Sequence, residues 1–286
     1  MVKKTDKKIH KDNKIIKSSS INHLTIHSLK ILDNLYYHTQ KHLNKTLGVG
    51  ESRKLTLDRD FTLPVRQTTL REWLGLEEEN NYQKKIRESL KQLETSIEVF
   101  NFIENGEAYT WGLKSFIKNI TESKSKEDNK SKLYSITIDK FLYNTILTLK
   151  GNFTEINLNY QKSWKSSNTL RLYQYLKSIQ NITDNKVHNL EWFNDFFNKK
   201  VKYVSKVEEF LNHSITLINR DTDIKVMILL DKKDKTFRFT IRDTNRKTKS
   251  ITNSDTDKYT EEEKQRYKIK KTLEENLMIK RMVEED

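Results

Sequence analysis

Residues 189–242 constrain the fold most strongly, because the hydrophobic period of this stretch changes along its length. Residues 204–219 place apolar side chains at steps of three and four, which is typical of a helix with one buried face. Residues 224–230 and 237–241 instead keep one set of apolar side chains at every second position, which indicates strands. A short charged turn at 231–235 joins these two runs and predicts a hairpin. A short aromatic helix is expected just before the 204–219 helix.

The second face of the 204–219 helix is polar and able to form hydrogen bonds. It carries Glu208 and Glu209, and its candidates for DNA contact, with one lysine just before the helix, are Lys202, Ser205, Lys206, Asn212, His213, Thr216 and Arg220. The hairpin tip carries three further cations that can hold DNA phosphates or simply keep the turn soluble, namely Lys232, Lys233 and Lys235. A polar helix followed by a hairpin with a basic tip is the layout of a winged helix, which places its second helix in the DNA major groove.

A similar pattern occurs earlier in the chain. A short helix is expected at 69–74 and a longer one at 81–95, where the apolar residues share one side. The opposite side of the longer helix carries Lys84, Lys85, Arg87 and Lys91. Residues 97–116 form two strand-like runs around a turn and predict the hairpin of this module, and the polar run 123–131 predicts a loop. We therefore expect a second winged helix whose basic helix contacts DNA.

Charge and composition fit this interpretation without proving it. The chain has 286 residues, and its Lys and Arg total 54 against 40 acidic residues. A formal net charge of +14 attracts phosphate backbones, although a Lys-rich composition is also typical of AT-rich genomes. Changes in composition predict a disordered basic arm at 1–20, a first winged-helix domain at 21–151, a second at 152–243, and a linker with a candidate C-terminal helix at 244–286.

The sequence favours binding over catalysis. The chain has no cysteine, which excludes disulfides and thiolate metal sites. Its 7 histidines do not share metal-ligand spacing with carboxylates, and no Gly-rich phosphate loop is found, so we expect no catalytic residue, no metal and no cofactor. No apolar run approaches the roughly 20 residues needed to span a bilayer, and the N-terminus does not resemble a secretory signal. We expect a cytoplasmic protein without membrane contacts.

Three stretches resemble the replication initiator (Rep) proteins of iteron-containing bacterial plasmids. Residues 167–177 have the sequence SNTLRLYQYLK. In the family, the corresponding region has a serine, a short spacer, Leu-Arg-Leu-Tyr and an aliphatic run. Residues 218–224 read INRDTDI, where the family has Ile-Asn, a spacer and a strand. Residues 237–241, FRFTI, match the family's last hairpin strand. No single motif is decisive, but their order across both winged-helix patterns indicates this family.

The resemblance implies an α+β, mainly helical fold with two tandem winged-helix domains and small antiparallel β wings. It implies binding to repeats (iterons) in double-stranded origin DNA, initiation of plasmid replication as a monomer, and repression of the protein's own promoter as a homodimer. It also implies the host replicative helicase and the host initiator as partners. A winged-helix transcriptional repressor and, in another class, a rolling-circle nickase are the alternatives.

One departure from the family concerns base reading. The family often has basic residues near the start of its main recognition helix, where this chain has Val207, Glu208 and Glu209. Base contacts are therefore expected from the polar side chains listed above for the 204–219 helix. Among them, Asn212 has the donor and acceptor pair that suits adenine.

Overall fold

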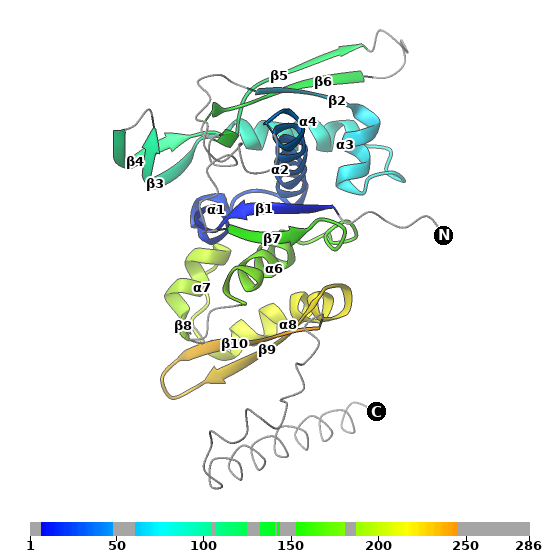
Figure 1. Ribbon diagram of the computed structural model, residues 1–286. Helices are drawn as coiled ribbons and strands as arrows, with labels where there is room; N and C mark the ends of the chain where they lie inside the picture. Colours follow the sequence, from blue (N-terminus) through cyan, green and yellow to red (C-terminus); the bar gives the residue numbers. More distant parts are fainter. Residues whose placement is uncertain are drawn as a thin grey trace, which may run out of the picture. The chain divides into compact units, whose positions relative to one another are not determined.

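The computed structural model contains the short aromatic helix, the second helix and the hairpin that are predicted for residues 189–242 (Figure 1). The structure describes residues 7–47, 61–104, 107–124, 132–140, 142–143, 153–180 and 187–244. The second module consists of α6 (Ser167–Ile179), β8 (Val187–Asn189), α7 (Leu190–Phe197), α8 (Val204–Asp221), β9 (Ile224–Asp231) and β10 (Thr236–Asp243). Its three strands have the order β8-β10-β9. This is a winged helix in which α8 is the second helix and β9–β10 form the wing.

Local chemistry sets the ends of the helices in this module. The side chain of Asn189 accepts a hydrogen bond from the Trp192 backbone N–H at 2.9 Å and so caps the start of α7. Asn198 ends α7 with a left-handed φ of 51°, a conformation that asparagine tolerates well. The aromatic side chains of α7 pack with Phe237 of the wing, and Phe193 is fully buried. The helix and hairpin therefore share one aromatic core.

The first module repeats this order with longer connections. It consists of α2 (Ile26–Leu47), β2 (Phe61–Arg66), α3 (Gln67–Leu74), α4 (Tyr82–Glu94), β5 (Ile117–Lys124) and β6 (Lys132–Ile138). Its sheet has the order β2-β6-β5, so the strand before the helices pairs with the last strand, as in the second module. The fold is therefore α+β and contains two winged-helix modules in tandem, as expected.

The hairpin assigned to the first module was placed too early in the chain. Residues 97–116 do form a hairpin, of β3 (Ile97–Glu104) and β4 (Glu107–Lys114), but this pair is a separate two-stranded sheet. The strands that occupy the wing position are β5 and β6, and β5 includes the first residues of the run that we expected to be a loop. Only Ile117 and Ile120 are apolar in β5, so its composition hides its role as a strand.

The expectation of a disordered arm at 1–20 is wrong from Lys8 onward. Residues 8–21 form β1 (Lys8–Asp12), α1 (Asn13–Lys17) and the 3-10 turn η1 (Ser19–Ile21). β1 pairs antiparallel with β7 (Phe153–Asn157), which leads into the second module. Ile9, Ile15 and Ile16 are buried, and the Lys11 amine is buried in an ion pair, so this lysine does not act as a solvent-exposed charge.

Residues 1–242 form one compact unit. β1 and β7 pair although one lies in the predicted arm and the other in the predicted second domain, so the divisions at 20 and at 151–152 stay proposals. The linker and the candidate helix of the 244–286 segment lie outside the described residues beyond Thr244.

Candidate nucleic-acid interface

α8 exposes the polar face that the sequence predicted. The buried side of the helix consists of Val204, Val207, Leu211, Ser214, Ile215 and Ile218. The side chains proposed for DNA contact are all exposed, namely Lys202, Ser205, Lys206, Asn212, His213, Thr216 and Arg220. The Thr216 hydroxyl donates to the Asn212 carbonyl oxygen at 2.9 Å, and its oxygen can still accept a hydrogen bond. The middle of this face therefore presents an amide, an imidazole and a hydroxyl.

The charges at the two ends of α8 are largely compensated. The Lys206 amine lies 2.6 Å from a Glu209 carboxylate oxygen. Arg220 donates two hydrogen bonds, at 2.7 and 3.0 Å, to the carboxylate of Asp221. The Arg220 hydrogen bond is also the main reason that the pKa of Asp221 is lowered. Glu208 is exposed on the same helix, so the surface of α8 is close to neutral and suits hydrogen bonding to bases more than attraction of phosphates.

The wing tip beside α8 is a turn with outward-facing lysines. A carboxylate oxygen of Asp231 accepts from the backbone N–H groups of Lys233 and Asp234, both at 3.0 Å, which fixes the turn. Lys235 has a left-handed φ of 52°. The predicted phosphate-binding side chains are all exposed, namely Lys232, Lys233 and Lys235.

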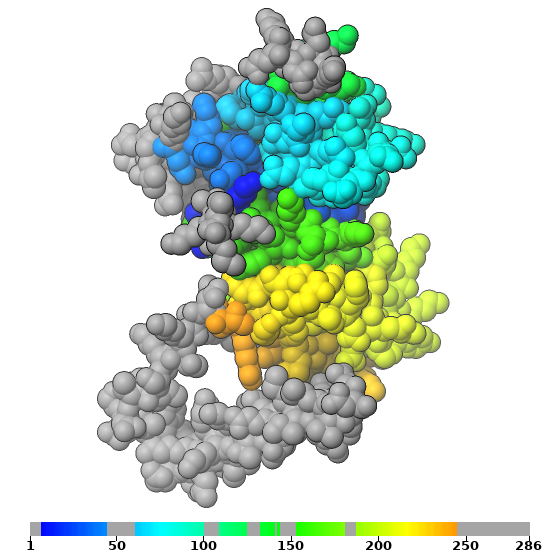
Figure 2. Space-filling view, turned by 90° about the vertical axis from the view of Figure 1, so that its right-hand side faces the viewer, coloured from blue at the N-terminus to red at the C-terminus, as the bar shows by residue number. Residues whose placement is uncertain are grey.

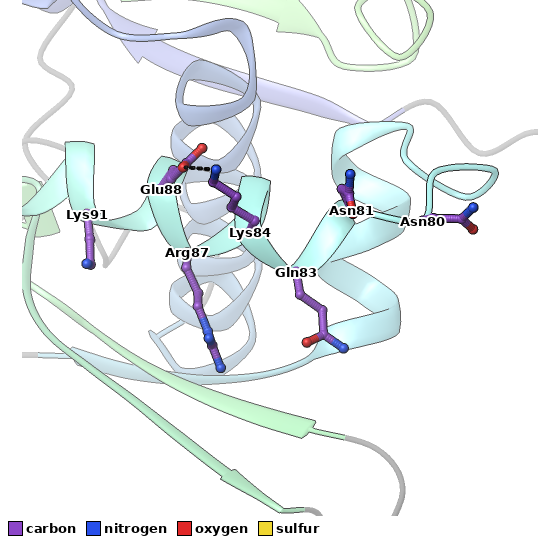
Figure 3. Close-up of a pocket in the computed structure, with 7 residues that line it drawn as sticks. All are labelled: Asn80, Asn81, Gln83, Lys84, Arg87, Glu88 and Lys91. Carbon is purple, nitrogen blue, oxygen red and sulfur yellow. Dashed lines mark ion pairs between the residues drawn. The ribbon is translucent and has the colours of Figure 1, made fainter.

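α4 of the first module presents a second polar face. One side of α4 and the turn before it form a surface depression (Figure 3), which is lined by Asn80, Asn81, Gln83, Lys84, Arg87, Glu88 and Lys91. Three of the four cations proposed for this helix are therefore together. Lys85 is half-buried, forms an ion pair with Glu79 and does not line the depression.

Arg87 is the cation of α4 with the most defined geometry. It extends toward the strands of the wing (Figure 3) and donates two hydrogen bonds of 3.0 Å to the Glu122 carboxylate on β5. The Lys132 amine on β6 lies 2.6 Å from the same carboxylate. The hydrogen bond from Arg87 is the largest of the effects that lower the pKa of Glu122 to about 2. Helix and wing are thus joined at a partly exposed cluster in which two cations share one anion.

Sequence reasoning missed some exposed side chains that belong to these surfaces. Asn80, Asn81 and Gln83 are neutral and were passed over because basic residues marked the helix, although their spacing places them on the face of Arg87. Tyr203, next to Lys202 at the start of α8, is 69% exposed. Its exposure could not be inferred from the sequence, because an isolated aromatic residue before a helix is more often part of a core.

Both modules contribute to one face of the molecule. Figure 2 shows the cyan segment, which includes α3 and the turn into α4, and the yellow segment of α8 on the same side, with green residues between them.

No helix in the described part of the chain is long and apolar enough to cross a membrane. Among the same residues, no group of three or more His, Asp or Glu side chains is arranged to hold a metal ion.

Comparison with known proteins agrees with this architecture. The family model described as "Initiator Replication protein, WH1" matches residues 8–177. A solved structure of the Pi initiator protein in complex with iteron DNA is similar in fold, with a TM-score of 0.55 and 13% sequence identity over 82% of this chain and 96% of that chain. No curated protein matches the sequence significantly. Because the family model matches more than half of the chain, this protein belongs to the initiator replication protein family.

Proposed function

We propose that this protein binds repeats in double-stranded origin DNA sequence-specifically and thereby initiates plasmid replication. The observation that carries the proposal is a chain with two winged-helix modules, each of which exposes a polar recognition helix, α4 or α8, above a buried apolar side. Membership in the initiator replication family supports the role in replication. The similarly folded Pi initiator protein was solved with iteron DNA, which supports the choice of ligand.

Base reading by α8 is assigned to Asn212, His213 and Thr216, because their groups can donate to or accept from base edges in the major groove. Lys206 and Arg220 would exchange a carboxylate partner for a phosphate, as would Arg87 in the first module. The remaining proposed contacts are to phosphates, from Lys84, Lys85, Lys91, Lys202, Ser205, Lys232, Lys233 and Lys235. Occupied repeats would bend or strain neighbouring AT-rich DNA, which costs on the order of a few kcal/mol per site.

The origin-bound protein would then recruit the host replicative helicase to the opened DNA. The host initiator would be a second partner. A cytoplasmic location follows from this target. Pull-down of the helicase by origin-bound protein, compared with protein bound to a random duplex, tests this step. Equal recovery on both duplexes would contradict recruitment at the origin.

DNA binding itself is tested by measuring affinity for origin duplex and random duplex over a range of salt concentrations. Each neutralised phosphate contributes a slope of about −0.9 to log K against log salt, so six or more contacts give a loss of about a thousandfold between 50 and 200 mM. Specific binding with a steep slope is expected. A flat salt response would show that the net positive charge reflects composition alone.

Autoregulation by a homodimer in equilibrium with monomer is a further part of the proposal. The exposed apolar side chains of β4 support it, because Trp111 and Leu113 are 52% and 57% exposed at alternate positions of one strand. Sedimentation of the wild-type protein and of the Trp111→Ser variant should show a larger monomer fraction in the variant. The variant should also repress its own promoter more weakly. An unchanged dimer fraction would place the contact elsewhere.

Two alternatives give different outcomes in simple assays. A transcriptional repressor would bind its promoter but would not support replication of an origin plasmid. A nickase would become covalently attached to a 5′ end when incubated with supercoiled origin plasmid and a divalent metal ion. Covalent attachment would reject the non-catalytic role proposed for this chain.

A further inference from the structure

A closed polar cluster is buried between α2 and α6. The Lys11 amine donates to the Asp33 carboxylate at 2.7 Å and to the Gln174 side-chain oxygen at 2.9 Å. The Gln174 side-chain nitrogen donates to the second carboxylate oxygen of Asp33 at 2.7 Å. Lys11 and Asp33 are 0% exposed and Gln174 is 2% exposed. The three side chains therefore bond to one another in a ring that excludes solvent.

The members of this cluster come from three separate parts of the chain. Asp33 lies on α2 of the first module, Gln174 lies on α6 of the second, and Lys11 lies on β1 of the N-terminal segment. The same segment has other bonds to the second module, because the Arg171 guanidinium donates to the Ser18 carbonyl oxygen at 3.0 Å. β1 also pairs with β7, which precedes α6. The N-terminal segment thus links α2 to α6.

A ring of this kind is far more directional than an apolar contact. Apolar side chains keep most of their contact energy when two helices slide or turn by a small amount, whereas hydrogen bonds weaken steeply when their angles change. A buried charge that loses its partner is also strongly destabilising, because no water replaces the partner. A shift of α2 relative to α6 would therefore strain or break the bonds among Lys11, Asp33 and Gln174.

Each of these two helices is bonded to one recognition helix. The Ser28 hydroxyl on α2 donates to the Ser89 carbonyl oxygen on α4 at 3.1 Å. The Thr169 and Ser214 hydroxyls join α6 to α8 at 2.9 Å in a buried position. A continuous series of packed elements therefore runs from α4 through α2, the buried cluster and α6 to α8.

We infer that Lys11, Asp33 and Gln174 are positioning residues that fix the separation and angle between α4 and α8, and with them the spacing between the two DNA segments read by one molecule. This inference rests on the proposed function. One base pair more or less between the two segments turns one relative to the other by about 34° and moves it by about 3.4 Å, because B-DNA has about 10.5 base pairs per turn. A rigid pair of helices tolerates such a change poorly, and a loosened pair tolerates it.

The test replaces the ring with apolar side chains of similar size, Lys11→Met, Asp33→Leu and Gln174→Leu together, since such replacement of a buried ion pair often leaves stability unchanged. The control is Lys8→Ala with Glu155→Ala, which removes an exposed 2.8 Å ion pair from the same β1–β7 ladder. Affinity is measured for duplexes selected by the wild-type protein from a random library. In these duplexes the spacer between the two protein-contacting segments is lengthened or shortened by one and two base pairs. Affinity is also measured for duplexes that contain only one of the two segments.

Wild type and control should lose about tenfold in affinity for each changed base pair of spacer, a loss similar to that of a mismatched base pair. The apolar triple variant should lose less than about threefold over the series, while its affinity for one segment stays within about twofold of wild type. A folded triple variant with the wild-type spacer profile would overturn the inference.

Two further results keep the test decisive. If the triple variant does not fold, Gln174→Met removes two of the three bonds and keeps the Lys11–Asp33 ion pair, and it should flatten the spacer profile in the same direction. An unchanged profile in that variant would also overturn the inference. Failure of the proposed function is distinguishable, because wild-type protein would then select no duplex from the library.

Discussion

Glu122→Gln should weaken the fold and strengthen DNA binding at the same time. The Glu122 carboxylate accepts two 3.0 Å hydrogen bonds from Arg87 and lies 2.6 Å from the Lys132 amine. Arg87 is half-exposed, so the lost ion pair is expected to lower the free energy of unfolding by only about 1 kcal/mol. Removing one negative charge about 4–8 Å from a phosphate contributes about 0.5–1 kcal/mol to binding in water, or about two- to fivefold in affinity.

The salt dependence gives a second and more specific signature. Arg87 released from Glu122 can form one additional phosphate contact, so the slope of log K against log salt should become steeper by about 0.9. Fluorescence anisotropy with an origin duplex measures affinity and slope, and urea denaturation measures stability. The control is Glu155→Gln, which makes the same chemical change in an exposed ion pair between Glu155 on β7 and Lys8 on β1. Weaker or unchanged binding by Glu122→Gln would show that Arg87 does not face DNA.

Further predictions concern base reading, the wing, a buried lysine and a tight turn. Replacing Asn212 and Thr216 by Ala should remove about 1–3 kcal/mol of discrimination between repeat and random duplex in competition assays, and unchanged discrimination would move base reading to α4. Alanine at all three wing-tip lysines should make the salt slope shallower by up to about 3, equally on every sequence, and no change would show that the tip only solubilises the turn. Burial lowers the pKa of Lys30 to about 8, so above that pH the unfolded chain binds more protons than the folded protein. The free energy of unfolding should therefore rise by about 2 kcal/mol from pH 7 to about pH 9.5 in urea titrations, and Lys30→Met should lack this rise. Gly75→Ala should destabilise by about 1–2 kcal/mol, because Gly75 has a φ of 67° and an added Cβ would lie 3.0 Å from a backbone oxygen; equal stability would contradict this strain.

The second helix and the hairpin of the second winged helix could be predicted because each has a strong local signal, whereas the three-residue strand β8 has none. The apolar residues of α8 follow the helical period, and those of β9 and β10 follow the strand period. The exposed face of α8 follows directly from that periodicity, so the predicted residues Asn212 and Thr216 are on the surface. Local patterns of this kind do not depend on distant parts of the chain.

Elements that depend on distant partners could not be predicted in the same way. Lys11 resembles any solvent-exposed lysine in the sequence, but its partners lie 22 and 163 residues away. β5 has only two apolar residues and is recognised as a strand by its pairing with β6. Likewise, the ion pair between Arg87 and Glu122 joins a helix to a strand across 35 residues. Counting basic residues alone therefore overestimates the net positive charge that α4 and α8 expose.

The central claim is that one molecule reads one origin repeat with two recognition helices. Hydroxyl-radical footprinting of the wild-type protein on a single repeat, compared with a variant in α4 (Arg87→Ala with Lys91→Ala) and a variant in α8 (Asn212→Ala with Thr216→Ala), tests this most directly. Two protected segments are expected about one helical turn of 34–36 Å apart, with each variant losing a different one. A single protected segment that only the α8 variant affects would contradict the account.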